Sequence, residues 1–236
     1  MIYLNIRISY KNMIIFDKES DESARDYAYR TIRDNIISLG LKPGEMVSEQ
    51  EIAKQMGISR TPVREALIEL SKSRLVEIIP QRGSFISKID YGIIEEVRFL
   101  RLTVEIAICE LACGYRTEED INKLEELVSL QEFYYERGVA DKLLDFDNKF
   151  HNLLYEIGNK NLVRKIVQDT TVHFDRVRRL SYTTVKDTKI IKDHKELIIA
   201  VKNQDKELAK QVMTKHLLRY KLDEELIRKE YPHYLI

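Results

Sequence analysis

Four side chains in the second half of the sequence have the types and spacing of a metal-binding set. Asp147 and His151 lie in the stretch LDFDNKFHNLLYEIGN one helical turn apart, so on a helix both would project from the same face. His194 and His216 each stand in line with apolar neighbours at helical spacing, so we expect both to face the interior of a helical bundle. Three imidazoles and one carboxylate suit zinc, nickel or another divalent transition ion. The alternative is that each histidine is a core residue hydrogen-bonded to its surroundings.

The composition is that of an ordinary globular chain. Its 236 residues include 39 Lys and Arg balanced by 39 Asp and Glu, which argues against a polybasic coat but permits a local basic patch. Two cysteines, Cys109 and Cys113, are too few for a disulfide scaffold and are expected to be small buried side chains. Because no apolar run approaches the roughly 18 residues of a membrane helix, we expect a cytoplasmic protein with no membrane partner.

Glycine and proline cluster between residues 40 and 92, which indicates a loop-rich small domain ahead of a long helical one. We expect an N-terminal extension over 1–22, a small domain over 23–90 and an all-helical domain over 91–236. A first helix should run from Ser23 to a terminating Gly40. In the third part, helical periodicity predicts helices near 90–113, 118–137, 140–157, 161–181, 187–203 and 205–229, with N-caps at Thr117 and Asp205.

The small domain has the spacing of a helix-turn-helix. Ala53, Gly57 and Val63 supply a small residue where two helices touch, a glycine for the turn and a β-branched residue to pack the second helix. Ser48 and Ser59 are placed to cap the two helices. A hairpin around QRG follows and can act as a wing. The fold class is therefore mainly α: a winged helix-turn-helix followed by an antiparallel all-α bundle.

The segment LKPGEMVSEQEIAKQMGISRTPVREALIELSKSRLVEIIPQRGSFIS resembles the winged helix-turn-helix of GntR-type transcriptional regulators, through PGE, SRTPVREAL and RGSFI. The resemblance implies that Arg60, Thr61 and Arg64, at the start of the second helix beside Ser59, read the major groove of double-stranded DNA. It also implies that the hairpin tip reaches the minor groove, and this tip carries Arg82 and Gly83. The alternative for these arginines is a solvated surface.

Two positions depart from the pattern of the relatives. Gln50 stands where some of them have an arginine that also contacts DNA, and Arg74 replaces the glycine usually found before the wing.

The C-terminal part resembles the FCD ligand-binding domain of the FadR subgroup of these regulators, through RLTVE, DNKFHNLLYEIGN, DHKELIIAV and TKHL. In metal-binding members the corresponding residues bind the ion, and members without them bind acyl-CoA, so the complete set here implies a small carboxylate effector. The resemblance also places Arg101 and Asn159 at the effector. Arg101 could instead be an exposed or dimer-interface residue, Asn159 a turn residue, and one arginine of the run DRVRR could face the pocket.

We therefore expect a homodimeric transcription regulator, a repressor, that binds a palindromic operator and responds to a small organic acid held through a divalent metal. No nucleophile elbow or glycine-rich phosphate loop is present, and Glu156, the nearby glutamate on the same helix, is offset from His151. We therefore expect no enzymatic activity. Two alternatives stay open: a metal-dependent helical-bundle enzyme that carries a DNA-binding domain, and a direct sensor of the metal ion.

Overall fold

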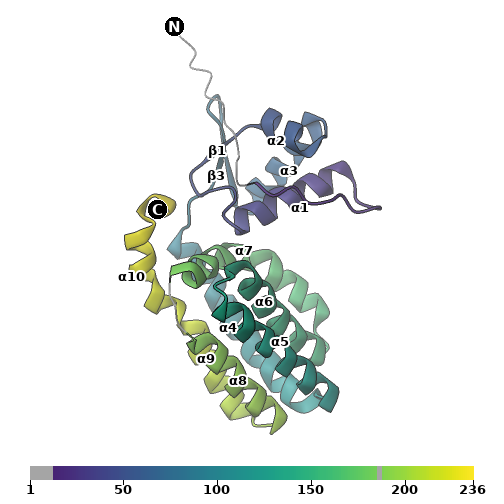
Figure 1. Ribbon diagram of the computed structural model, residues 1–236, viewed down its shortest axis with the longest axis vertical. Coiled ribbons are helices and arrows are strands. Elements are labelled where there is room, and N and C mark those ends of the chain that lie inside the picture. Colours follow the sequence, from purple (N-terminus) through teal and green to yellow (C-terminus); the bar gives the residue numbers. More distant parts are fainter. Residues whose placement is uncertain (1–12, 185–187) are drawn as a thin grey trace. The chain divides into compact units, whose positions relative to one another are not determined.

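The computed structural model describes residues 13–184 and 188–236, which divide into two compact units (Figure 1). The N-terminal unit comprises the described residues up to Asp90 together with His233–Ile236, and the helical unit comprises Tyr91–Pro232. The expected extension over 1–22 lies partly outside the described residues. The expected helical domain over 91–236 differs from the structure in its last four residues, which pack with the N-terminal unit.

The N-terminal unit is a three-helix domain with a small antiparallel sheet, as the sequence predicts for a winged helix-turn-helix. The sheet has the order β1, β3, β2, and its first strand was not predicted because two residues are too few for a visible alternation. The elements are α1 (Ala24–Ile37), β1 (Met46–Val47), α2 (Glu49–Met56), α3 (Arg60–Lys72), β2 (Val76–Ile79) and β3 (Gly83–Ile86).

Local signals explain where the helices of this unit begin and end. The Ser48 side chain accepts a hydrogen bond from the N–H of Glu51 and so caps α2, as predicted. Gly57 ends α2 with a φ of 66°, a left-handed conformation that favours glycine. Val63 is fully buried on the inner face of α3. Ser59 precedes α3 as expected, but its side chain makes no capping hydrogen bond, so the capping role predicted for it is wrong.

Two turns differ from the sequence prediction. The first helix ends at Ile37, and Leu39 adopts the left-handed conformation (φ 61°) that we had expected Gly40 to supply. In the wing, Gln81 takes a left-handed φ of 62° at the tip of the hairpin, and Gly83, which opens strand β3, has a φ of 114° that also favours glycine. Only the first of these turns closes without a glycine at positive φ, so composition alone could not locate the end of α1.

The helical unit is a bundle in which α4 packs against α9 and α5 against α6 (Figure 1). Thr117 and Asp205 cap α5 and α9, as predicted. The expected helix over 205–229 is two helices with a break at Arg219, where no glycine or proline marks it. The helices are α4 (Tyr91–Tyr115), α5 (Glu118–Glu136), α6 (Ala140–Ile157), α7 (Asn161–Thr184), α8 (Lys189–Lys202), α9 (Lys206–Leu218) and α10 (Tyr220–Glu230).

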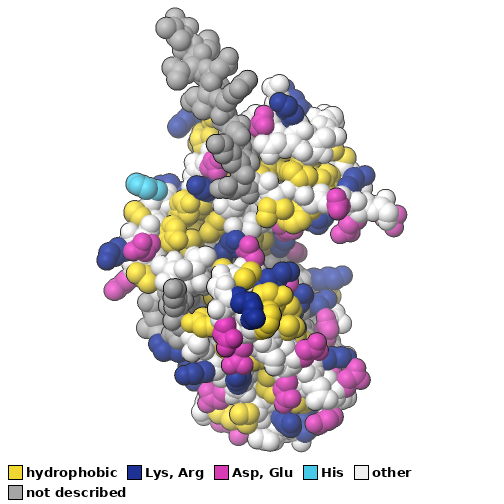
Figure 2. Space-filling model, in the orientation of Figure 1, with side chains coloured by type: hydrophobic (Ala, Val, Ile, Leu, Met, Phe, Trp, Pro, Cys, Tyr) yellow, Lys and Arg dark blue, Asp and Glu magenta, His cyan; other side chains and the backbone are white. Residues whose placement is uncertain are grey.

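The bundle core is apolar and includes both cysteines. Cys109 and Cys113 lie on α4 with no solvent exposure, which confirms the expectation of small buried side chains. Lys, Arg, Asp and Glu side chains are interspersed over the face of this unit in Figure 2. Among the described residues, no helix is both long and apolar enough to cross a membrane.

The C-terminal residues add a parallel bridge to the N-terminal unit. After α10, a short 3₁₀ helix (Pro232–Tyr234) leads to Leu235, which is buried and pairs with Ile89. The N–H of Ile89 donates to the carbonyl of Tyr234 at 2.8 Å, and the N–H of Ile236 donates to the carbonyl of Ile89 at 3.1 Å. Residues 234–236 therefore satisfy backbone groups at the end of the first segment of the N-terminal unit.

Candidate metal centre and DNA-binding surface

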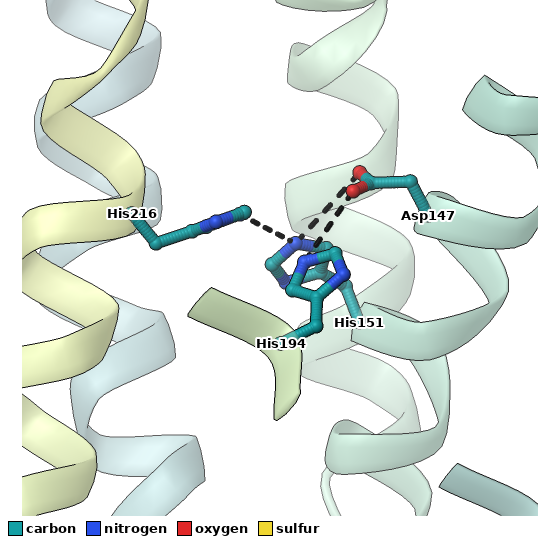
Figure 3. Close-up of side chains that lie close together, drawn as sticks. All are labelled: Asp147, His151, His194 and His216. Carbon is teal, nitrogen blue, oxygen red and sulfur yellow. Dashed lines mark hydrogen bonds and ion pairs between the residues drawn. The ribbon is translucent and has the colours of Figure 1, made fainter. Parts of the chain in front are cut away.

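Three helices bring the four predicted ligands together (Figure 3). Asp147 and His151 project from α6, His194 from α8 and His216 from α9, and one ligand atom of each lies within 4.8 Å of the others. The Nε2 atoms of His151 and His216 are 3.2 Å apart. The carboxylate oxygens of Asp147 lie 3.4 Å from Nε2 of His194 and 3.8 Å from Nε2 of His151. All three imidazoles thus present Nε2 to one point beside Asp147.

These distances fit a single small divalent ion. Metal bonds of about 2.0 to 2.1 Å place neighbouring tetrahedral ligand atoms about 3.3 Å apart. The separations of 3.2, 3.4 and 3.8 Å lie near this value, and ligand atoms up to 4.8 Å apart would have to move closer to share one ion. Nε2 of His194 is buried without a hydrogen-bond partner in the described structure, which a metal bond would satisfy. The donor set of three imidazole nitrogens and one carboxylate matches zinc or nickel better than calcium.

Two of the candidate ligands, His194 and His216, are held in the neutral form that metal ligation needs. Burial, and then the proximity of His216, holds the pKa of His194 well below its usual range. Burial, and then the proximity of His151, does the same to the pKa of His216. Neutral imidazoles carry a free lone pair at neutral pH, so little proton competition is expected at these two ligands.

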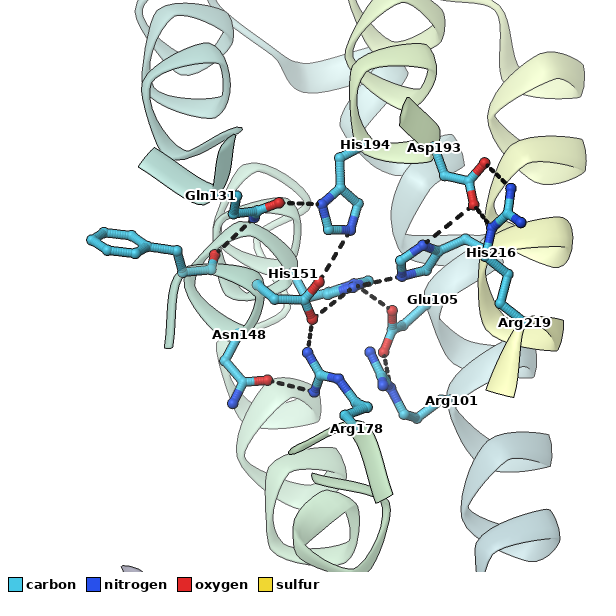
Figure 4. Close-up of polar contacts among 12 residues, drawn as sticks. Arg101, Glu105, Gln131, Asn148, His151, Arg178, Asp193, His194, His216 and Arg219 are labelled. Atoms are coloured by element: carbon cyan, nitrogen blue, oxygen red, sulfur yellow. Dashed lines mark hydrogen bonds and ion pairs between the residues drawn. The ribbon is translucent and has the colours of Figure 1, made fainter. Parts of the chain in front are cut away.

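A ring of polar side chains surrounds the four ligands (Figure 4). Oε2 of Glu105, on α4, lies 2.7 Å from Nδ1 of His151, and its Oε1 accepts a 2.7 Å hydrogen bond from Arg101. Oε1 of Gln131, on α5, lies 2.7 Å from Nδ1 of His194. Burial alone would raise the pKa of Glu105, but the charges of Arg101 and His151 outweigh burial and lower it, so Glu105 is an anion.

Arg178, from the run DRVRR on α7, is the second buried arginine of the cluster. Its guanidinium forms an ion pair with Asp147 and donates 2.7 Å hydrogen bonds to Asp175 and Asn148. Burial lowers its pKa to about 10, which still leaves it charged at neutral pH. Asp193 on α8 pairs with Arg219 at the break between α9 and α10. The cluster therefore contains both acids and fixed cations.

The two residues predicted to contact an effector are placed very differently. Arg101 is 3% exposed and reaches the cluster through Glu105, so it is neither an exposed nor an interface residue in this chain. Asn159 is exposed at the turn after α6, two helical turns beyond His151, with a left-handed φ of 54°. Contact between Asn159 and the effector stays a prediction, and the tolerance of asparagine for a positive φ in a turn also explains its position.

The predicted DNA-reading side chains form an exposed set on the N-terminal unit. Arg60, Thr61 and Arg64 are exposed at the N-terminal end of α3, and Ser59 beside them is exposed as well. Arg60 forms a 3.1 Å ion pair with Glu49 on α2. At the wing, Arg82 and Gly83 are both exposed, and the guanidinium of Arg82 lies 5.9 Å from the ring centroid of Phe85.

Comparison with known proteins decides the family. Residues 24–86 match the family described as bacterial regulatory proteins, gntR family, and residues 96–219 match the FCD domain. The chain is 31% identical over 203 residues to the HTH-type transcriptional repressor RspR of Escherichia coli K12, covering 86% of this chain and 89% of that protein. The chain belongs to the GntR family of transcriptional regulators and carries an FCD domain. The FCD match takes in all four candidate metal ligands.

Further relatives agree with this assignment. An uncharacterized HTH-type regulator of Streptomyces ambofaciens is 32% identical over 213 residues, with 86% of each chain covered. Among solved structures, E. coli McbR/YncC has a TM-score of 0.75 at 20% identity and covers 89% of this chain and 99% of its own. A GntR regulator from Rhodococcus sp. RHA1 has a TM-score of 0.72 at 24% identity, with 89% and 100% covered. These structures share the fold.

Within this GntR regulator, sequence reasoning missed several residues of the cluster. Glu105 stands four residues after Arg101, which was itself predicted to lie at the effector, so the pairing of the two on one helix face could have been predicted from the spacing. Arg178 belongs to a basic run that the sequence analysis left without an assigned residue. Gln131 and Asn148 carried no signal, because their partners lie on other helices.

Proposed function

We propose that this regulator binds DNA through the N-terminal end of α3 and the wing. The proposal is supported by the exposure of Arg60, Thr61 and Arg64 on one helix end, and of Arg82 beside the fully exposed start of β3. Arginine can make bidentate contacts to guanine in the major groove, each worth about 1 to 3 kcal/mol of discrimination. Ser59 and Gly83 would approach the DNA backbone at the two edges of this surface.

We further propose that Asp147, His151, His194 and His216 bind one divalent transition ion, zinc or nickel. The observation that carries this proposal is the convergence of three Nε2 atoms and one carboxylate within 4.8 Å inside the bundle. A bound ion supplies a Lewis-acidic centre to which an effector oxygen can coordinate. The protein contributes the buried setting and the neighbouring charges.

The charges around the site favour an anionic effector. Arg101 and Arg178 face three carboxylates, those of Glu105, Asp147 and Asp175, so the buried group with neutral imidazoles carries one net negative charge. The adjacent ion pair between Asp193 on α8 and Arg219, at the break between α9 and α10, adds no net charge. A divalent ion would turn this balance into one net positive charge, which one carboxylate would neutralise. The effector is therefore a small organic acid.

The regulator would act as a homodimeric repressor on a palindromic operator. The repressor role is supported by the likeness to RspR, whose name describes a repressor.

A homodimer is supported by large apolar side chains that are exposed on the helical unit and that a second copy would cover. Among them are Phe99 on α4 and Leu162 and Ile166 on α7. Two copies present two recognition helices to the two halves of a palindrome. The acid would act through its different affinity for the DNA-competent and DNA-incompetent states.

The experiment begins with operators selected from random double-stranded DNA by the purified full-length chain loaded with zinc or nickel. Anisotropy of the selected DNA is then measured with metal alone and with a panel of small acids, each matched by its uncharged amide. His194→Gln removes one ligand, and His233→Gln is the matched control, because His233 is exposed in the other unit.

We expect about one metal ion per chain in the parent and in His233→Gln, and a large loss in His194→Gln. An acid that releases DNA while its amide does not would support the effector class. A parent that contains no transition metal after supplementation would contradict the metal site, and a selected sequence without palindromic symmetry would contradict the dimer. Release of DNA by the ion alone would identify a direct metal sensor instead.

A further inference from the structure

The three candidate imidazole ligands differ in the contacts of Nδ1, the ring nitrogen on the side opposite the cluster centre. For His151 and His194 the Nδ1 atom, which faces away from the cluster centre, lies 2.7 Å from an oxygen of Glu105 or of Gln131 (Figure 4). For His216 the corresponding oxygen, on Asp193, is 3.9 Å from Nδ1 and beyond hydrogen-bonding distance. Two of the three rings therefore have an oxygen atom close to Nδ1, and the residues that supply it, Glu105 and Gln131, come from different helices.

The orientation of the Gln131 amide is fixed by the backbone. Its Nε2 donates a hydrogen bond to the carbonyl of Phe146 at 3.2 Å, so the amide nitrogen points to α6 and Oε1 points to His194. Gln131 is 1% exposed, and water does not compete for these contacts. Because Oε1 can only accept, Nδ1 of His194 must carry the proton. The lone pair of His194 then lies on Nε2, the atom that faces Asp147.

Glu105 imposes the same choice on His151 by its charge. Its carboxylate is 3% exposed and accepts a hydrogen bond from Arg101 through the other oxygen. An ionised carboxylate has no proton to donate, so Nδ1 of His151, 2.7 Å from its oxygen, is the ring nitrogen whose proton the carboxylate stabilises. In that tautomer Nε2 of His151 keeps its lone pair and lies 3.2 Å from Nε2 of His216.

We propose that Gln131 and Glu105 are positioning residues that fix His194 and His151 in the Nδ1–H tautomer and thereby preform the Nε2 face of the metal site. This inference rests on the proposed metal function of the cluster. Arg101 takes part by holding Glu105, a role different from effector contact. Among the described residues, no acceptor lies within hydrogen-bonding distance of Nδ1 of His216, so His216 is the ligand whose ring we expect to turn when the ion enters or leaves.

The experiment separates the tautomer from the metal affinity. Protein labelled with ¹⁵N at histidine is compared by long-range ¹H–¹⁵N correlation in the metal-free state, where the ring nitrogen that carries the proton is read directly. Cobalt(II) affinity is measured by competition with a chelator. The variants are Gln131→Leu, which removes the acceptor at similar volume, and Gln131→Glu, which restores it. Glu105→Leu and Glu105→Gln form the second pair, and Leu124→Ala is a destabilising core control on α5, away from the cluster.

Gln131→Leu is expected to shift His194 to a mixture of tautomers and to weaken cobalt binding about 10- to 100-fold. Gln131→Glu should restore the Nδ1–H form, and Leu124→Ala should lower thermal stability while leaving tautomers and affinity unchanged. If Glu105→Leu fails to fold, Glu105→Gln and the Gln131 pair still decide.

Unchanged tautomers and cobalt affinity in Gln131→Leu, with a parent that binds cobalt, would overturn the positioning role and leave the metal site standing. A parent that binds no cobalt would contradict the metal site itself, whereas the tautomer measurement needs no metal and would still report whether Gln131 and Glu105 set the rings.

Discussion

Arg178 is ion-paired with Asp147, the one carboxylate among the four candidate metal ligands. A metal ion at this site must share Asp147 with the guanidinium or displace it. Arg178 also donates to Asp175 and Asn148, so it can stay in place when Asp147 turns to the ion. Without an ion, Arg178 therefore supplies the positive charge that pairs with Asp147. With an ion bound, Arg178 would stay beside it and could pair with an anion.

Replacing Arg178 by glutamine should therefore strengthen metal binding and weaken the metal-free fold. Removing a buried cation that competes for Asp147 is expected to raise zinc affinity about tenfold, or about 1.4 kcal/mol. The uncompensated carboxylate should lower the metal-free free energy of unfolding by about 3 kcal/mol. Zinc titration and denaturant unfolding measure both effects. Arg179→Gln is the control, because Arg179 pairs with Asp141 outside the cluster; weaker zinc binding in Arg178→Gln would contradict the competition.

Arg64→Ala should reduce operator affinity and relax the base preference at one position of each half-site. Because the side chain of Arg64 is exposed on α3 and lies outside the core, its removal should leave the fold unchanged. Loss of one bidentate guanine contact costs about 1 to 3 kcal/mol. Binding would be measured on the selected operator and on single-base variants of it. Arg137→Ala, which removes the same charge from the helical unit, should bind like the parent, and an Arg64→Ala protein with unchanged base preference would refute the recognition-helix assignment.

Arg74 adopts a left-handed φ of 58° directly after α3, at the position where many GntR regulators have glycine. A residue with a Cβ atom is strained there by about 1 kcal/mol. Arg74→Gly should therefore raise the free energy of unfolding by up to about 1 kcal/mol, measured by denaturant unfolding of the full chain. Ser73→Gly is the opposing control, since Ser73 has a φ of −85° and glycine there adds only unfolded-state freedom. Destabilisation by Arg74→Gly would contradict this prediction. It would mean that contacts of the arginine side chain stabilise the fold by more than the left-handed backbone conformation destabilises it.

Stability of the metal-free protein should fall as the pH is lowered below about 6.5. Burial holds the pKa values of His194 and His216 well below the ordinary value of about 6.5, so the unfolded chain binds more protons than the folded chain in this range. Above pH 6.5 the two histidines do not lower the free energy of unfolding. Below pH 6.5 each of them lowers the free energy of unfolding by about 1.4 kcal/mol per pH unit. Thermal unfolding in chelator from pH 5 to 8 tests this. His216→Gln should flatten the dependence and His233→Gln should not; an equally steep curve in His216→Gln would contradict the assignment.

The sequence predicted the parts that depend on spacing along one helix and missed those that depend on packing between helices. Asp147 and His151 share a helix face, and the pattern around His194 placed it on a buried face, so their convergence could be anticipated. Gln131 is 63 residues from His194, and only the packing of α5 against α8 joins them. The break at Arg219 was invisible because an ordinary helical sequence continues through it. Its side chain is held by Asp193 of another helix.

The pairing of Ile89 with Leu235 makes the N-terminal unit discontinuous in sequence. The helical unit is inserted between two pieces of the unit that binds DNA, so the chain crosses from one unit to the other twice, after Asp90 and after Pro232. A fragment that ends at residue 90 would leave the backbone of Ile89 without its partners. The helical unit is therefore connected to the N-terminal unit at both of its ends, through α4 and through α10. Helix α10 follows α9, which carries the candidate ligand His216, so both connections lie on helices that are next to, or part of, the candidate site.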